Sequence, residues 1–476
     1  MCLPPIIWRA SSFIKIFKLF GDDFITVLTT IALIIIAVVL FELIIFIHEG
    51  GHFIAAKKSG IKVNEFALGM GPKLFSFTKG ETTYSLRLFP IGGYCAMEGE
   101  DEDSDNPRAF NNAKIWKRMI VIVAGAFMNI VLGLVLMLIT LLPQEQFAST
   151  TVSEFSPSSF TAVTGLQPGD QITKINDYDV NTSTDFSFAL FTLPVSEIDG
   201  HELSIYKEDC AFDLYTRATE LVDDKTTDEQ NAALVTSLQE AQAKTAKAES
   251  KEEAYQIFSE YYNSLADIVG KEHADSIPKI EEKDTRQRFR TDMTVIRDGE
   301  KVELKDVDLL TLKKSADDDT PQLRIDFYIK PIEKNFGTVI EQTFSNTVSV
   351  VRMVWGSLIG LRRGQFSLND MSGPVGIAST ITKVAGESLR TSGFGSAVNS
   401  IVYIMMVITI NLGVVNMLPF PALDGGRFLM LLIEWIFRKP VPRKVESIIN
   451  AVGLVLLLGL SVFIAFQDVW KIFSGG

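Results

Sequence analysis

Four long apolar runs set the strongest constraint on how this chain can fold. They span residues 24–47, 119–142, 399–418 and 447–467; the first holds one charged side chain, Glu42, and the others hold none. A helix rises about 1.5 Å per residue, so about 20 apolar residues cross the hydrocarbon core of a bilayer. The sequence therefore predicts four membrane-spanning helices, of which the third can continue to Phe437 after an interruption.

The composition fits a membrane protein that also has a large soluble part. Hydrophobic residues make up 47% of the 476 residues, charged residues make up 22%, and the mean hydropathy is +0.21. The net charge of -13 argues against nucleic-acid binding, which requires a basic face. Three cysteines without a C-x-x-C pair predict neither a disulfide framework nor a cysteine metal site.

Lysine and arginine indicate how the spans are oriented. Ten of these residues lie between positions 53 and 118, and four lie between 438 and 444. Cytoplasmic loops are enriched in Lys and Arg, so both loops are predicted to be cytoplasmic. Residues 143–398 and both termini then lie outside, and the chain is a multi-pass protein of the inner (plasma) membrane.

Two amphipathic regions are predicted beside the spans. Residues 1–23 combine basic and apolar side chains, which is typical of a segment on the membrane surface. Residues 335–398 are predicted to form amphipathic surface helices on the outer side. Within them, residues 344–361 hold only one charge, Arg352. The competing interpretation is a fifth span, which would put the two halves of the site proposed below on opposite sides.

The first run ends on His48-Glu49-Gly50-Gly51-His52, which is an H-E-x-x-H motif. Four residues make just over one helical turn, so both imidazoles face one way. Two such nitrogens can hold a zinc ion, and Glu49 can take a proton from a water that the zinc activates. The alternative is that these polar residues only cap the inner end of the span.

A catalytic zinc usually needs a third protein ligand, and Asp424 is the candidate. Pro419 and Pro421 are predicted to break the third run, and Gly425-Gly426 allow an unusual backbone. A carboxylate at membrane depth is costly and is therefore a functional candidate. The first histidine of the motif and this aspartate lie 24 and 25 residues into their runs, which predicts a similar depth. The alternative is a loop aspartate that caps the next helix.

These segments resemble the site-2 proteases, which are intramembrane zinc metalloproteases, and in particular their bacterial regulator-of-sigma-factor type. The resemblance rests on HEGGH, on NMLPFPALDGG, and on residues 60–77, 84–100, 108–129 and 371–378. It implies that His48, His52 and Asp424 bind Zn²⁺ and that Glu49 is the catalytic base. Ala126 and Arg427 depart from the usual family residues, a proline and a histidine. Glu42 is expected to pair with another polar group.

The segment TTYSLRLFPIGGY favours strands with a turn at its Pro and Gly residues. The resemblance implies a membrane-associated β-loop whose edge holds an extended substrate. Tyr84, Leu86 and Leu88 are the predicted substrate-binding residues of this loop, and Asn416 is predicted to bind the substrate backbone. The alternative is an ordinary cytoplasmic hairpin.

Residues 150–330 resemble an extracytoplasmic α+β PDZ domain, which in this family is thought to filter substrates. Its parts are residues 155–180 and the strand–Asp-Gly turn–strand of 291–309. Residues 195–290 are predicted to be a helical insert, with capping boxes at Thr227-x-x-Gln230 and Ser250-x-x-Glu253. It either packs on itself or on the PDZ domain, or presents a surface that senses a partner. His201 and His273 are interpreted as solvated residues.

The predicted fold is thus an α-helical integral membrane protein, built from residues 24–142 and 399–476, with a PDZ domain outside. The predicted function is an intramembrane zinc endopeptidase. It would cut within the transmembrane segment of single-span membrane proteins, such as anti-sigma factors or signal-peptide-like substrates, after a site-1 protease. One alternative is a catalytically silent scaffold that binds proteins through its PDZ domain, which the presence of Glu49 disfavours. The other alternative is a zinc transporter, which would need ionisable residues along several spans.

Overall fold

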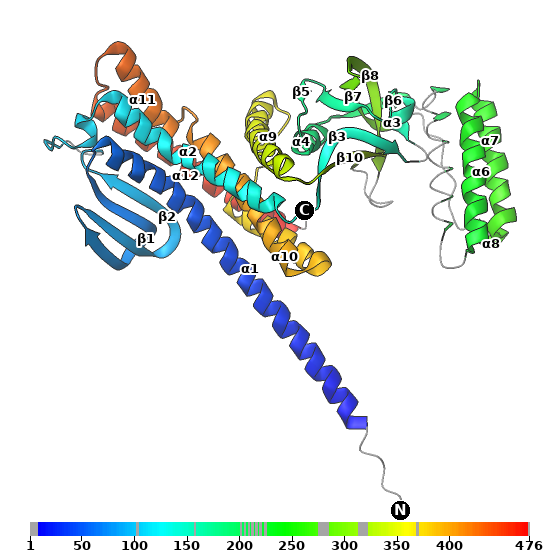
Figure 1. Ribbon diagram of the computed structural model, residues 1–476, viewed down its shortest axis with the longest axis horizontal. Helices are drawn as coiled ribbons and strands as arrows, with labels where there is room; N and C mark the ends of the chain where they lie inside the picture. Colours follow the sequence, from blue (N-terminus) through cyan, green and yellow to red (C-terminus); the bar gives the residue numbers. More distant parts are fainter. Residues whose placement is uncertain are drawn as a thin grey trace, which may run out of the picture. The chain divides into compact units, whose positions relative to one another are not determined.

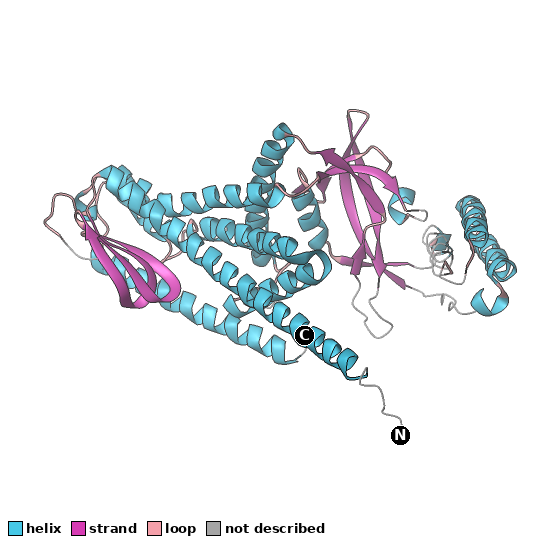
Figure 2. Ribbon diagram, turned by 60° about the horizontal axis from the view of Figure 1, so that its bottom comes forward, coloured by secondary structure: helices cyan, strands magenta, loops and turns pink. Residues whose placement is uncertain are grey.

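The computed structural model describes residues 8–474, apart from 101–103, 157–158, most positions between 200 and 225, 275–284, 313–321 and 368–370. The chain divides into two compact units. The membrane unit consists of Met1–Gln144 and Asn335–Gly476, and the sheet unit consists of Glu145–Lys334. Figure 2 shows strands in both units and long helices in the first.

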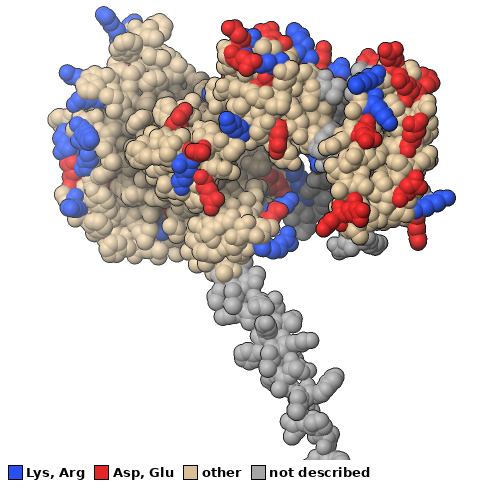
Figure 3. Space-filling model, turned by 45° about the vertical axis from the view of Figure 1, so that its right-hand side comes forward, with Lys and Arg blue, Asp and Glu red and all other residues tan. Residues whose placement is uncertain are grey.

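Long helices dominate the membrane unit, and α1, α2 and α10 pack against one another (Figure 1). Four helical stretches are long and apolar enough to cross a membrane: Ile31–Ser59, Ile115–Leu141, Val375–Asn416 and Lys444–Lys471. The four predicted spans are therefore confirmed at the level of length and composition. Figure 3 shows wide areas of surface without a charged side chain, as lipid-facing helices require. The helices of the unit are α1 (Trp8–Ser59), α2 (Ile115–Leu141), α9 (Phe336–Arg363), α10 (Pro374–Asn416), α11 (Asp424–Phe437) and α12 (Arg443–Ser474), with a 3-10 turn at Phe110–Asn112.

Helix α1 is longer at both ends than the first apolar run. It begins at Trp8, so residues 8–23 are the first turns of the same helix and not a separate segment; residues 1–7 lie outside the described part of the chain. The helix ends only at Ser59, beyond His52. The H-E-x-x-H motif therefore lies inside a continuous helix and does not end it.

Helices α9 and α10 differ in how they meet their surroundings. Asn335 caps α9 by accepting a hydrogen bond from the Thr338 backbone N–H. One face of α9 exposes Phe336, Ile340 and Phe344 at a spacing of four residues, while other positions of the helix are buried. Helix α9 is not one of the four candidate spans. Helix α10 kinks at Gly393, where φ is 84°.

The chain is non-helical between α10 and α11, as the two prolines predicted. Gly425 and Gly426 were predicted to allow an unusual backbone, but both residues are helical, so glycine is needed at these positions for another reason. A β-carbon on Gly425 would lie 2.2 Å from the Leu418 carbonyl oxygen, and one on Gly426 would lie 2.2 Å from the Phe420 carbonyl oxygen. The glycines therefore let the broken segment fold back onto the first turn of α11. The positive φ is at Ala422, at 71°.

The sheet of the membrane unit consists of β1 (Val63–Lys79) and β2 (Thr82–Met97). Phe66 of β1 pairs with both Tyr84 and Cys95 of β2, which shows that β2 bends back and passes β1 twice. The first half of β1 thus lies between two segments of β2, and the hairpin halves 73–79 and 82–87 pair with each other. Residues 93–97 pair only with the first half of β1.

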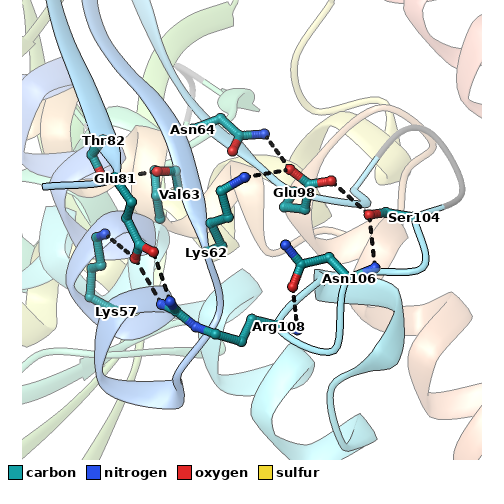
Figure 4. A network of polar contacts seen from close by, with 10 residues as sticks. All are labelled: Lys57, Lys62, Val63, Asn64, Glu81, Thr82, Glu98, Ser104, Asn106 and Arg108. Carbon is teal, nitrogen blue, oxygen red and sulfur yellow. Dashed lines mark hydrogen bonds and ion pairs between the residues drawn. The ribbon is translucent and has the colours of Figure 1, made fainter. Parts of the chain in front are cut away.

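Charged residues between α1 and α2 form a polar network at the end of this sheet (Figure 4). Glu81 accepts hydrogen bonds from Arg108 at 2.7 Å and Lys57 at 2.9 Å, and Glu98 accepts them from Ser104 at 2.6 Å and Lys62 at 3.2 Å. The bonds from Arg108 and then Lys57 lower the pKa of Glu81 to about 2. Those from Ser104, Asn64 and Lys62 lower the pKa of Glu98 to about 2.

The sheet unit contains an antiparallel eight-stranded sheet in the order β10-β3-β4-β7-β8-β9, with β5 beside β4 and β6 beside β7. Ile172 and Ile175 are buried in its core, as their strand positions predicted. Asp298 and Gly299 form the predicted turn with positive φ values of 52° and 85°. The strands are β3 (Gln146–Phe155), β4 (Gln171–Ile175), β5 (Tyr178–Asp179), β6 (Val195–Asp199), β7 (Thr285–Arg297), β8 (Glu300–Leu312), β9 (Gln322–Arg324) and β10 (Phe327–Glu333). The short helices are α3 (Phe160–Val163) and α4 (Ser183–Phe191).

The insert of this unit is narrower than the predicted range of 195–290. The first and last residues of the predicted range belong to strands β6 and β7, since Val195 pairs with Phe289 and Asp199 pairs with Thr285. Between them lie α6 (Asp228–Lys247), α7 (Lys251–Val269) and α8 (Lys271–Ala274), which share a buried apolar core.

Only one of the two predicted capping boxes forms. The Thr227–Gln230 box is present at the start of α6. At α7, Ser250 accepts from the Glu253 N–H, but the Glu253 carboxylate bonds to the N–H of Glu249 instead of Ser250.

Candidate metal centre

Three side chains from distant parts of the sequence converge in the membrane unit. His48 and His52 come from α1, and Asp424 is the first residue of α11. The two Nε2 atoms lie 3.3 Å apart, and each lies 3.4 Å from Asp424 Oδ2. In tetrahedral coordination, ligand atoms at about 2.0–2.1 Å from a zinc ion lie roughly 3.3–3.4 Å from one another. The triangle formed by the two Nε2 atoms and Asp424 Oδ2 therefore has the dimensions of three zinc ligands.

The ring of His52 is held so that Nε2 faces this triangle. Its Nδ1 donates to the Val121 carbonyl oxygen at 2.8 Å, which leaves Nε2 as a lone-pair donor for a metal. Gly125 of α2 makes room for the ring, because a β-carbon there would lie 2.2 Å from His52 Nε2. Helix α2 thus sets both the tautomer and the position of one ligand.

His48 is held by Asn129, a fully buried residue of α2. Asn129 Nδ2 lies 3.1 Å from His48 Nδ1, while Asn129 Oδ1 is buried without a hydrogen-bond partner. When Nε2 binds a metal, Nδ1 carries the proton and needs an acceptor. Turning the amide by 180° places Oδ1 on that proton and satisfies both groups. The amide then orients His48 as the carbonyl orients His52.

The third ligand depends on the broken segment. Asp424 Oδ2 is buried and has no hydrogen-bond partner among the described residues, an arrangement that a cation would complete. The segment before it is fixed to α12, since Asn450 accepts a hydrogen bond from the Ala422 N–H at 3.3 Å. Gly453 adds to this contact, because a β-carbon there would lie 2.4 Å from Pro421. Packing of three helices therefore positions the carboxylate.

Glu49, the predicted base, follows the first histidine and faces β2. Its Cγ lies 3.5 Å from the position that a β-carbon on Gly93 would occupy. The absence of a side chain at Gly93 lets the open segment 93–97 pass close to this carboxylate. Asn416, the last residue of α10, lies on another side, with its Nδ2 3.4 Å from His48 Nε2. The structure thus brings both predicted residues to the metal centre.

Two of the remaining predicted substrate-binding residues, Tyr84 and Leu86, lie in the sheet but not at its open edge. Tyr84 pairs with Phe77 on one side and Phe66 on the other, and Leu86 is likewise paired on both sides. Their main chains are therefore already hydrogen-bonded. Leu86 and Leu88 are 46% and 47% exposed, so both offer apolar side chains at the surface of the hairpin.

No second cluster of three or more metal-binding side chains occurs in the described part of the chain. His273 lies with Nε2 3.2 Å from the Leu221 carbonyl oxygen, and His201 is outside the described residues. Glu42 differs from its prediction: both carboxylate oxygens are buried and have no hydrogen-bond partner among the described residues.

Three residues of the site, Asn129, Gly125 and Gly93, were not predicted from the sequence. Asn129 carried a usable signal, because it is an amide in an otherwise apolar run. The two glycines carried none, since only the tertiary contacts show which atoms approach them.

Comparisons with known proteins agree with this geometry. The model of peptidase family M50 matches residues 36–460. A protein of Clostridium acetobutylicum named as a zinc metalloprotease is 31% identical over 92% of this chain and 97% of its own length. A similarly named protein of Clostridium perfringens is 30% identical over 92% and 98%. The regulator of sigma-W protease of Bacillus subtilis is 26% identical over 92% and 99%. The chain therefore belongs to peptidase family M50, the site-2 proteases, and is a multi-pass zinc metalloprotease.

Proposed function

We propose that this protease is an intramembrane endopeptidase of the inner (plasma) membrane. It hydrolyses a peptide bond within the transmembrane segment of single-span membrane proteins. The observation that carries the proposal is the location of the metal triangle. Two of its ligands lie within the candidate span Ile31–Ser59, and the third follows the break at the end of the candidate span Val375–Asn416. A site built between spans serves substrates that are themselves in the bilayer.

The residues around the triangle suit peptide hydrolysis. Bound zinc supplies a Lewis acid for the scissile carbonyl and lowers the pKa of water. Glu49 takes the proton of the attacking water and delivers it to the nitrogen of the leaving amine. Asn416 holds its amide beside His48, where it donates to the substrate carbonyl or backbone. His48, His52 and Asp424 hold the ion, and Asn129 and the Val121 carbonyl orient the two imidazoles.

A substrate must reach this site as an extended chain, because a helix hides its backbone from attack. Residues 93–97 pair on one side only and pass Glu49 at Gly93. We propose that the unwound substrate adds to this segment as a further strand. Tyr84, Leu86 and Leu88 belong to the apolar face of the hairpin, which also exposes Phe75 and Phe77. This face lies against the membrane and receives the apolar side chains of the substrate.

The proposed substrates include anti-sigma factors, and the Bacillus subtilis relative is named as a regulator of sigma-W. We propose that the sheet unit is an extracytoplasmic PDZ-type domain. It would admit a substrate only after a site-1 protease has removed the outer part. The pairing of β6 with β7 supports an insertion in this domain, because the insert leaves and re-enters the sheet at neighbouring positions.

The test uses Glu49→Gln in the full-length protein, with a single-span reporter whose outer part is already removed. We expect full zinc content and a cleavage rate lower by roughly 10²–10⁴-fold, the usual worth of a general base. Cleavage at the wild-type rate would reject Glu49 as the base. A zinc-loaded wild type that binds such reporters and cuts none of them would favour the scaffold alternative.

A further inference from the structure

A groove on the membrane unit is separate from the metal centre. It has a volume of about 370 Å³ and runs between α1 and α2. Residues of both helices line it, among them Gly51, Ile54 and Lys58 of α1 and Trp116, Ile120 and Phe127 of α2. The zinc ligands His48 and His52 are not among them. Its floor is formed where α1 and α2 approach closely, since a β-carbon on Gly51 would lie 2.4 Å from the Ala124 carbonyl oxygen.

The polar groups of the groove gather at one end. Lys58 and Ser59 are the last residues of α1, and Trp116 and Lys117 are in the first turn of α2. Lys117 donates to the Ser59 carbonyl oxygen at 2.8 Å. Lys58 is exposed and forms no ion pair with any described residue, and no carboxylate lines the groove. This end therefore offers two ammonium groups, and neither forms an ion pair with a carboxylate of the described residues; the Lys117 ammonium also lies 5.8 Å from the centroid of the Trp116 ring.

The rest of the groove is apolar and follows candidate spans. Ile54, Ile120 and Phe127 are 47%, 50% and 61% exposed, so their side chains face the surroundings of the helices. From Trp116 to Met128 the groove follows thirteen residues of α2, which rise by about 18 Å at about 1.5 Å per step. That length suits one acyl chain, with the lysines at the membrane–water interface.

We propose that this groove binds one phospholipid with an anionic headgroup. The phosphate lies between Lys58 and Lys117, the Trp116 indole anchors the interface, and an acyl chain lies along Ile120, Ala124 and Phe127. Charge complementarity selects this occupant over a substrate helix, because a transmembrane helix has no anionic group that must lie at this depth. The headgroup lies on the side where α1 ends and α2 begins.

The test measures lipid retention by native mass spectrometry on the full-length protein in detergent. The probes are phosphatidylglycerol and phosphatidylcholine with identical acyl chains. We expect one phosphatidylglycerol to be retained in preference to phosphatidylcholine. Lys58→Gln is expected to reduce this retention roughly fivefold, and the double variant with Lys117→Gln roughly 25-fold, because each lysine charge adds its own attraction. Glutamine at 117 keeps a donor for the Ser59 carbonyl.

Two further variants separate the groove from general charge effects. Lys79→Gln, at an exposed lysine of β1, is the matched control and should retain as much phosphatidylglycerol as the wild type. Ile120→Trp fills the apolar part while the lysines remain, and should lower retention of both lipids. Equal retention of the two lipids by the wild type, or undiminished phosphatidylglycerol in the double variant, overturns the proposal. Displacement of the lipid by an uncharged transmembrane peptide would assign the groove to a protein helix and also overturn it.

Discussion

The orientation of Asn129 leads to a quantitative prediction about zinc affinity. Asn129→Leu keeps the volume of the side chain but removes the acceptor for the Nδ1 proton of His48. The residue is fully buried, so water cannot replace the lost partner. Loss of a partner that orients a zinc ligand weakens metal binding by roughly 10–100-fold, which corresponds to about 1.4–2.7 kcal/mol. That range agrees with the cost of about 1–3 kcal/mol for a buried polar group left without a hydrogen bond.

The matched variant Asn129→Asp tests the amide orientation itself. A carboxylate can only accept, so it bonds to Nδ1–H and should keep zinc affinity near the wild-type value. If the Asn129 amide donated to His48 Nδ1 instead, Asn129→Asp would lower the zinc affinity as much as Asn129→Leu.

The assay is competition for zinc between a calibrated chelator and the purified full-length protein in detergent. Asn399→Leu is the control, because Asn399 of α10 also forms a side-chain hydrogen bond with α2, to the Thr140 carbonyl oxygen, but lies away from the zinc ligands. A wild-type zinc affinity in Asn129→Leu, with folding intact, would refute the reasoning.

Three further predictions concern the packing at the metal centre, the polar network and the sheet unit. Gly125→Ala should abolish stoichiometric zinc binding, because its β-carbon would overlap the His52 ring, whereas Gly386→Ala, in open space on α10, should bind zinc normally; metal analysis of both variants decides this. Acidification should loosen residues 98–112: the folded pKa values of Glu81 and Glu98 are about 2, so their hydrogen bonds stabilise the network above about pH 5 and are lost as the pH falls towards 2. Hydrogen exchange of this segment at pH 6 and pH 3 measures the effect, and Glu98→Gln should exchange rapidly at both; protection that does not change with pH would contradict it. Replacing residues 147–332 by a short linker is possible because Gln146 and Glu333 are paired, and this variant should cleave substrates whose outer part is intact. Continued refusal of those substrates would show that the sheet unit is not the filter.

Local patterns predicted the helices, several turns and two of the three ligands. The spacing of His48 and His52 predicts one helix face, because four residues make about one turn. The Asp298-Gly299 turn and the Thr227–Gln230 capping box also depend only on neighbouring residues, and both formed. The boundaries were less accurate: α1 continues through the histidines to Ser59, because H-E-G-G-H interrupts the apolar run without interrupting the helix.

Other predictions failed where a distant partner decides the outcome. Glu42 was expected to find a polar partner, and none of the described residues supplies one. Tyr84 and Leu86 remain predicted substrate-binding residues, but the bent β1 pairs with them on both sides, so the open edge of the loop lies at residues 93–97. The strand preference of the segment was read correctly, but the register of a sheet depends on the whole of its partner.

The sequence by itself determined that this chain crosses a membrane and carries a zinc motif, because hydrophobic length and helical spacing are properties of consecutive residues. Only the tertiary structure decided that Asp424 closes the triangle and that Val121, Gly125 and Asn129 orient the two imidazoles. These contacts join residues that are 69 to 376 positions apart. Their geometry depends on how helices pack, to within a few tenths of an ångström, and no local pattern encodes that packing.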